Sequence, residues 1–177
     1  MTEHHLLTPL LLEDVARLRV GDTVFLSGLI YTARDKAHLS LRKQGSPVCL
    51  KGAALYHCGP LIREDRVLSA GPTTSGRLAR YTEEILRLGV RAIIGKGGLP
   101  AEPFRNRAIY LAFPGGCGAA AARQLKVVGV HLPELGMAES IWEFEAEDLG
   151  PMIVAVDSQG RDLYGEVKKS AQSRLKG

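Results

Sequence analysis

Residues 23–45, TVFLSGLIYTARDKAHLSLRKQG, change their pattern halfway and indicate the class of fold. The first half, 23–31, is rich in β-branched and aromatic side chains and follows Gly21, which is typical of a strand. The second half, 33–45, has a helical pattern that ends at Gly45. A strand that leads directly into a helix is the repeating unit of α/β proteins.

The same alternation of strand and helix continues along the chain. Strands are expected at 52–58, 65–71, 90–95, 108–113 and 126–130, and late in the chain at 141–150 and 151–157. Helices are expected at 8–22, 74–88 and 118–125. The sequence therefore predicts a single α/β domain over residues 1–177, built around a largely buried sheet. Its tail after about residue 165 is expected as a solvated helix or a frayed end.

Composition is that of an ordinary globular protein, with 45% hydrophobic and 24% charged residues. The net charge is +4, but aromatic residues make up only 6% and no dense Lys/Arg block occurs, which argues against a nucleic-acid partner. The first residues lack the basic region of a signal peptide, and no run reaches about 18 apolar residues. We therefore expect a soluble, cytoplasmic protein with no membrane partner.

The three cysteines, Cys49, Cys58 and Cys117, have neither CxxC nor CxH spacing. An odd number is typical of reduced thiols in the cytosol, and three are too few for a four-thiolate metal cluster. Cys117 begins an expected helix, whose start would somewhat lower the pKa of the thiol, but no general base is near in sequence. His57 and His131 show no metal-ligand spacing. We expect no metal site in this chain.

Three polar stretches each follow an apolar strand directly. They are TARDKAH (32–38), GPTTSGR (71–77) and GKGG (95–98). In open α/β sheets, ligands bind where strands hand over to helices. Arg34, Arg77 and Lys96 are therefore expected to share an anion pocket, although any one of them alone would be read as a solvated surface cation.

The stretch GPTTSGR allows two compatible interpretations. Thr73 or Thr74 stands where a helix cap belongs, and free amides at a helix start favour an anion. Arg77 lies four residues beyond Thr73, so a helical first turn would put both on one side. The stretch is thus a structural cap, a carboxylate receptor, or both. A phosphate loop is the weakest interpretation; the glycine-rich 113–125 lacks the GKS or GKT ending of a P-loop.

The motifs TARDKAH, YHCGP, GPTTSGR, GKGG and ELGMAESIWEFEAEDLGPMIVAVDSQGRDLY occur in this order. Together they resemble the β-subunit, or C-terminal domain, of the class I fumarate hydratase and L(+)-tartrate dehydratase family, from about Pro9 to Tyr164. The resemblance implies a swivelling β/β/α fold and the reversible addition of water to fumarate. It also implies a [4Fe–4S] cluster ligated by a separate α-subunit rather than by this chain, and an assembly of two α- and two β-subunits.

The resemblance also implies roles for individual residues. Arg34 corresponds to a clamp on a substrate carboxylate, Thr73 to the base that moves the C3 proton, and Arg77 and Lys96 to cations on the substrate. Thr74 and Gly97 fall within the same substrate-binding motifs, and Asp35 and His38 correspond to residues that support Arg34 from behind. Cys58 and Cys117 have no counterpart in the pattern. L(+)-tartrate is the alternative substrate, and a non-catalytic anion-binding or regulatory module is the alternative function.

Overall fold

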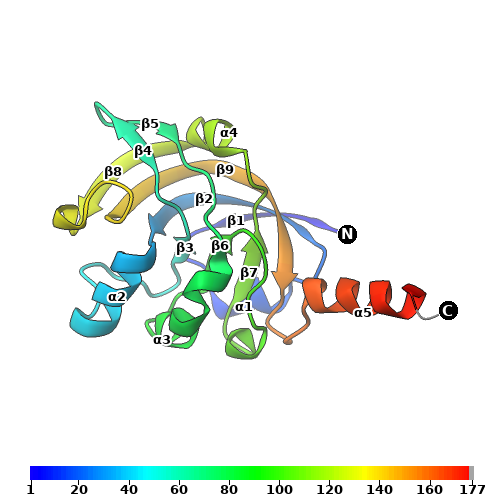
Figure 1. The fold of residues 1–177 in the computed structure, drawn as a ribbon. Coiled ribbons are helices and arrows are strands. Elements are labelled where there is room, and N and C mark those ends of the chain that lie inside the picture. The colour runs from blue at the N-terminus through cyan, green and yellow to red at the C-terminus, as the bar shows by residue number, and fades with distance from the viewer. Residues whose placement is uncertain (176–177) are drawn as a thin grey trace.

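The computed structural model describes residues 1–175, and within them one mixed sheet of seven strands dominates the fold (Figure 1). Its strand order is β1 (Glu3–Leu7), β2 (Thr23–Thr32), β3 (Ala54–Tyr56), β6 (Ala92–Gly95), β7 (Ile109–Ala112), β9 (Ile141–Val156) and β8 (Leu125–His131). Strands β4 (Leu61–Arg63) and β5 (Arg66–Ser69) form a separate antiparallel hairpin. The predicted α/β class is confirmed.

Two long strands close the sheet on itself. The first half of β2 pairs with β1 and the second half with β3, while its other edge pairs with β9. Strand β9 likewise pairs with β8 over its first half and with β7 over its second. Strands β2, β3, β6, β7 and β9 therefore form a closed ring, in which β2, β3, β6 and β7 are parallel. Their carboxyl ends meet at one rim.

The helices lie outside this ring. They are α1 (Leu12–Ala16), α2 (Asp35–Gln44), α3 (Thr82–Arg87), α4 (Gly118–Ala122) and α5 (Leu163–Leu175), with 3₁₀ turns η1 (Ser75–Tyr81), η2 (Glu102–Phe104) and η3 (Pro133–Leu135). In Figure 1, α2 and α3 lie side by side, and α5 projects from the body as an exposed helix. Of the two forms expected for the tail, a solvated helix and a frayed end, the described residues form the solvated helix. Within residues 1–175, no helix is both long and apolar enough to cross a bilayer.

The short strands are buried on both faces. In β6, Ala92 and Ile94 belong to the core cluster that fills the ring, whereas Ile93 packs in a second cluster against the helices. Tyr110 of β7 also belongs to the second cluster. Because both faces of these strands are covered, they appear in the sequence as continuous apolar runs.

The structure differs from the predicted elements at four places. Strand β1 was not expected, because its parallel pairing with Thr23–Ser27 is invisible in a local pattern. The two late strands form one continuous strand, β9. Pro151 is tolerated within it because it lies at an irregularity in the pairing of β9 with β2, where the proline's lack of an N–H costs no regular hydrogen bond. The leading helix is limited to α1, and the expected helix 74–88 is a 3₁₀ turn, η1, followed by α3.

Candidate functional site

The candidate site begins where the GPTT segment inserts between two strand ends. The Thr73 N–H donates to the carbonyl of His57, just after β3, at 2.7 Å. On the other side the Lys96 N–H donates to the carbonyl of Thr73 at 3.2 Å, and the Ser75 N–H donates to the carbonyl of Lys96 at 2.9 Å. The segment therefore continues the sheet between the carboxyl ends of β3 and β6, and holds Thr73, Thr74 and Lys96 in fixed register.

Arg77 joins two of the other predicted residues. Its Nη2 donates to Thr73 Oγ1 at 3.0 Å and to Asp35 Oδ2 at 3.3 Å. The Arg77 side chain is 50% exposed, and among residues 1–175 its Nη1 and Nε have no hydrogen-bond partner. A guanidinium that uses one nitrogen on the protein and leaves the others toward solvent can still bind a carboxylate through its fork.

The expected helix cap is not formed. Thr74 is the residue before η1, but its side chain makes no capping hydrogen bond, and the first turn is 3₁₀ rather than α. The cause lies in competing contacts, since the Thr73 hydroxyl accepts from Arg77 and the Thr74 backbone bridges to Lys96. The idea of a threonine-capped helix start as the carboxylate receptor is therefore wrong. The predicted same-side placement of Thr73 and Arg77 is confirmed.

Arg34 lies against Glu139, a partner that the sequence did not predict. Its Nε is 3.6 Å from Glu139 Oε1, and Glu139 also accepts from the backbone N–H of Lys36 at 2.7 Å. Gly59 leaves room for the Arg34 side chain, because a Cβ at position 59 would lie only 2.6 Å from Arg34 Cδ. Glu139 stands in the ELGMAES motif and Gly59 in YHCGP, so the two motifs converge on one arginine.

His38 and Asp35 act on different neighbours. His38 is buried, with Nδ1 2.8 Å from the carbonyl oxygen of Arg34, so it holds the backbone of Arg34 in place. Burial lowers the pKa of His38 to about 4. Asp35 contacts Arg77 rather than the Arg34 side chain.

Lys96 is tied to the site through its backbone. Its side chain lies along Gly115 and lines a cavity of about 500 Å³ with Tyr164, Phe113 and Pro114. Gly97 follows in the left-handed conformation, with φ of 75°, which suits glycine. Within residues 1–175 the Lys96 ammonium makes no ion pair, and neither Arg34 nor Arg77 lines the cavity beside it. Arg34, Arg77 and Lys96 all lie in segments that follow strand ends at the same rim, and a single anion pocket shared by the three stays a prediction.

A buried polar cluster behind this rim was missed by the sequence analysis. The side chains of His57, Ser75 and Tyr110 are all inaccessible to solvent; His57 Nδ1 lies 2.8 Å from Ser75 Oγ, and the Tyr110 hydroxyl lies 3.0 Å from Ser75 Oγ. Burial keeps the pKa of His57 well below its ordinary value. The available signal was polar residues within apolar runs, as in LYHC and IYLA.

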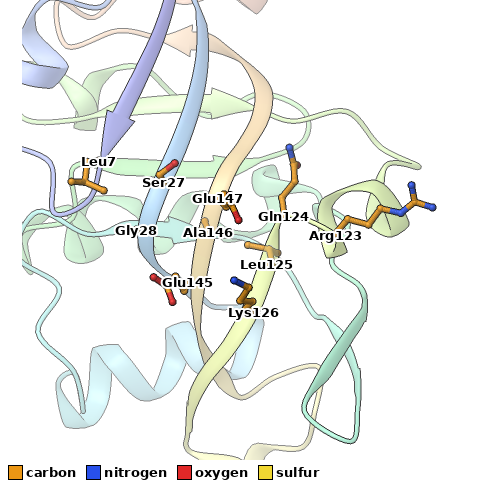
Figure 2. A pocket seen from close by; sticks show the side chains of 10 residues that line it. All are labelled: Leu7, Ser27, Gly28, Arg123, Gln124, Leu125, Lys126, Glu145, Ala146 and Glu147. Carbon is orange, nitrogen blue, oxygen red and sulfur yellow. The ribbon is translucent and has the colours of Figure 1, made fainter.

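A second cavity lies away from these residues. Its volume is about 260 Å³. Residues of β2, β9 and the start of β8 line it, and the lining includes charges of both signs, Arg123, Lys126, Glu145 and Glu147 (Figure 2). None of the predicted site residues lines it. It therefore has no part in the candidate site.

The cysteines do not form a ligand set. Cys58 is buried, which raises the pKa of its thiol to about 12, and Cys49 is exposed. The expected acidification of Cys117 is wrong: burial raises the pKa of its thiol, which donates to the carbonyl of Pro114 at 2.8 Å. In the described part of the chain no three His, Cys, Asp or Glu side chains gather as metal ligands, so these residues do not fit an iron–sulfur cluster.

The fold and site define an α/β domain with cationic side chains at the rim formed by the carboxyl ends of its parallel strands. A family model described as the fumarase C-terminus matches residues 2–167. The chain therefore belongs to the fumarase C-terminus family, as the motifs indicated.

Curated relatives cover nearly all of the chain. It is 41% identical to the putative L(+)-tartrate dehydratase subunit beta of Methanocaldococcus jannaschii, over 92% of each chain. It is 39% identical to the L(+)-tartrate dehydratase subunit beta of Escherichia coli, over 93% of this chain and 88% of that one. It is also 36% identical to the putative class I fumarate hydratase of Geobacillus stearothermophilus, over 94% of this chain but 34% of that longer protein.

Proposed function

We propose that this chain is the β-subunit of a hydro-lyase that reversibly hydrates a four-carbon dicarboxylate, with fumarate to L-malate as the first candidate reaction. The observation that carries the proposal is the contact of Arg77 with Thr73 and Asp35 at the strand rim that also bears Lys96 and Arg34. Small dicarboxylates need cations at both ends, and this rim supplies them on separate loops.

The residues of this rim suit an elimination or hydration beside a carboxylate. Removal of a proton next to the carboxylate moves negative charge onto its oxygens, and fixed cations stabilise that charge. The free donors of Arg77 would bind such a carboxylate. A threonine hydroxyl is a weak base, but Arg77 donates to Thr73 Oγ1 and so favours a negatively charged oxygen there. Thr73 is proposed as the residue that moves the C3 proton, with Thr74 and Gly97 beside it on the substrate.

The proposed active site is completed by another chain. The two tartrate dehydratase relatives are named as beta subunits, and the longer fumarate hydratase relative contains this region as about a third of its length. We propose an α-subunit partner that ligates a [4Fe–4S] cluster, in an assembly of two copies of each subunit. The described residues of this chain offer no ligand set for such a cluster, so its ligands would come from the partner.

L(+)-tartrate is the second candidate substrate, and the names of the relatives in Methanocaldococcus jannaschii and Escherichia coli favour it. Fumarate and tartrate carry the same two carboxylates, so the cations of the rim suit both. Tartrate has an additional hydroxyl group, and the Thr74 side chain, which forms no capping bond, offers a hydroxyl that could receive it.

The test is to co-express the chain with an α-type subunit, reconstitute the complex anaerobically, and assay fumarate and tartrate separately. Arg77→Ala is expected to abolish turnover while the complex still assembles. Arg87→Ala is the matched control and should leave turnover unchanged. It removes an exposed arginine that forms an ion pair with Glu83 of the same helix, α3, away from the rim. A complex with an intact cluster and no turnover on either acid would overturn the proposal and favour a non-catalytic anion-binding module.

A further inference from the structure

The buried side chains of His57, Ser75 and Tyr110 have no role in the reaction as proposed, yet they lie between two segments of the rim. Tyr110 of β7 reaches the carbonyl oxygen of Gly97 at 2.8 Å, and Ser75 follows Thr74 directly. His57 supplies the carbonyl that accepts from the Thr73 N–H. The cluster therefore links the segment that carries Thr73 to the loop that carries Lys96 and Gly97.

The hydrogens of this cluster can be placed by counting donors. The Gly97 carbonyl can only accept, so the single hydrogen of the Tyr110 hydroxyl is directed to it. The Ser75 hydroxyl must then donate its hydrogen to the Tyr110 oxygen, across 3.0 Å. That leaves Ser75 Oγ as the acceptor for His57, whose Nδ1 must carry the ring proton across 2.8 Å.

The opposite direction is costly. If Ser75 donated to His57 Nδ1, the ring proton would sit on Nε2, which is buried and has no hydrogen-bond partner among the described residues. A buried N–H without an acceptor bears the full cost of its lost hydration. In the first arrangement Nε2 carries only a lone pair, beside the ring of His38 at a centroid distance of 5.0 Å.

We propose that His57, Ser75 and Tyr110 form a one-way hydrogen-bond chain, from His57 Nδ1–H through both hydroxyls to the Gly97 carbonyl, which positions the Thr73 segment against the Lys96–Gly97 loop. The three are positioning residues, since none faces the open rim. Gly95 accommodates the chain, because a Cβ there would overlap the Ser75 hydroxyl. The positioning role rests on the proposed function; the direction of the chain does not.

The direction is tested by ¹⁵N NMR of the histidine rings in the full chain, with His57 assigned by comparison with His57→Gln. The expected spectrum has a protonated Nδ1 and an unprotonated Nε2 for His57, unchanged between about pH 5.5 and pH 8. A protonated Nε2, or an imidazolium in this range, would overturn the chain. This result is independent of any enzyme activity.

The positioning role is tested by Tyr110→Phe in the reconstituted complex. The loss of the last donor should lower kcat by about tenfold, roughly 1.4 kcal/mol, with a smaller change in KM. Tyr81→Phe is the matched control, since Tyr81 is also buried but its hydroxyl has no hydrogen bond within the described residues. Equal kcat in the two variants would refute positioning. If the wild-type complex turns over neither acid, the proposed function and the positioning role both fail, and the NMR result still decides the direction.

Discussion

Arg77 and Thr73 are four residues apart and are joined by a hydrogen bond of 3.0 Å from Nη2 to Oγ1, although the turn between them is 3₁₀. The threonine hydroxyl is therefore held beside a positive charge instead of capping a helix. A charged donor favours the oxygen of this hydroxyl in its most negative state. This pairing gives Thr73 a chemical environment that Thr74 lacks.

The first prediction concerns this hydroxyl. Thr73→Ser keeps the acceptor for Arg77 and should retain most of the activity of the reconstituted complex, whereas Thr73→Val removes it and should lower kcat by at least about 100-fold. The backbone bonds of Thr73 are unchanged in both variants, so their thermal unfolding midpoints should agree. Steady-state kinetics on fumarate and tartrate measure the effect. Similar activity in the two variants would show that the hydroxyl is not needed.

The second prediction concerns Asp35, which fixes Arg77 from the other side. Because both side chains are at least 40% exposed, Asp35→Asn should change the free energy of unfolding by less than about 1 kcal/mol. It should nevertheless lower kcat/KM, since Arg77 loses an anchor. Glu83→Gln is the matched control, as Glu83 pairs with Arg87 and Arg107 away from the rim. A stability loss without a loss of kcat/KM would contradict this assignment.

The third prediction concerns Gly95. A methyl group at this position overlaps the Ser75 hydroxyl, so Gly95→Ala should destabilise the fold by about 1–3 kcal/mol, as overpacking does in other cores. Gly76→Ala is the control, because a Cβ there meets nothing closer than 3.8 Å. Urea unfolding of both variants, followed by circular dichroism, measures the difference. Equal midpoints would mean that the cluster rearranges freely.

The fourth prediction concerns pH. Burial lowers the pKa of His38 from 6.5 to about 4 in the folded chain, so the unfolded chain binds the proton more readily and acid favours unfolding. Stability should therefore fall as the pH drops from 6.5 toward 4, and His38 should account for about 2 kcal/mol of the loss between about pH 7.5 and about pH 5. His57, whose pKa burial also lowers, adds to the loss in the same direction.

Denaturant unfolding of wild type and His38→Gln at several pH values checks this. The variant should lose less stability on acidification. His5→Gln is the control: the pKa of His5 is raised by its hydrogen bond to Asp148, so this substitution should not reduce the acid loss. A wild-type acid loss that persists in full in His38→Gln would contradict the prediction.

The fifth prediction concerns the thiols. Cys49 is exposed, Cys117 is partly buried with a raised pKa, and Cys58 is buried with its pKa raised to about 12. Because the thiolate is the reactive form, an alkylating reagent should label Cys49 first, Cys117 more slowly, and Cys58 only after unfolding. Mass spectrometry of timed samples gives the order. Rapid labelling of Cys58 in the folded chain would contradict its burial.

The sequence alone predicts most of the elements that carry the rim. The local sequence patterns correctly predict β2, α2, β6 and β7. In these elements the tertiary packing favours the same secondary structure as the local sequence does. The predicted placement of Thr73 and Arg77 on the same side depends only on their spacing of four residues. These features are local, and local features can be read from one chain.

Long-range partners could not be predicted in this way. Glu139 is more than a hundred residues from Arg34, and Tyr110 is 35 residues from Ser75. The threonine cap failed for the same reason, since pairing of the Thr74 backbone with Lys96 competes with the helical start. Which hydroxyl or carboxylate meets which cation is decided by the closed ring, and the ring leaves no local pattern.

Closure of the ring by β2 and β9 also constrains how the protein is made. Thr23 pairs with Ile153 and Tyr31 with Glu143. Strand β2 can therefore form these pairs only after β9, more than a hundred residues later in the sequence, has been synthesised. Contacts of such sequence separation form slowly and late. During synthesis, β2, β3, β6 and β7 must leave the ribosome as an unfinished sheet with open edges. The rim at the strand ends is therefore completed only after β9 has been translated.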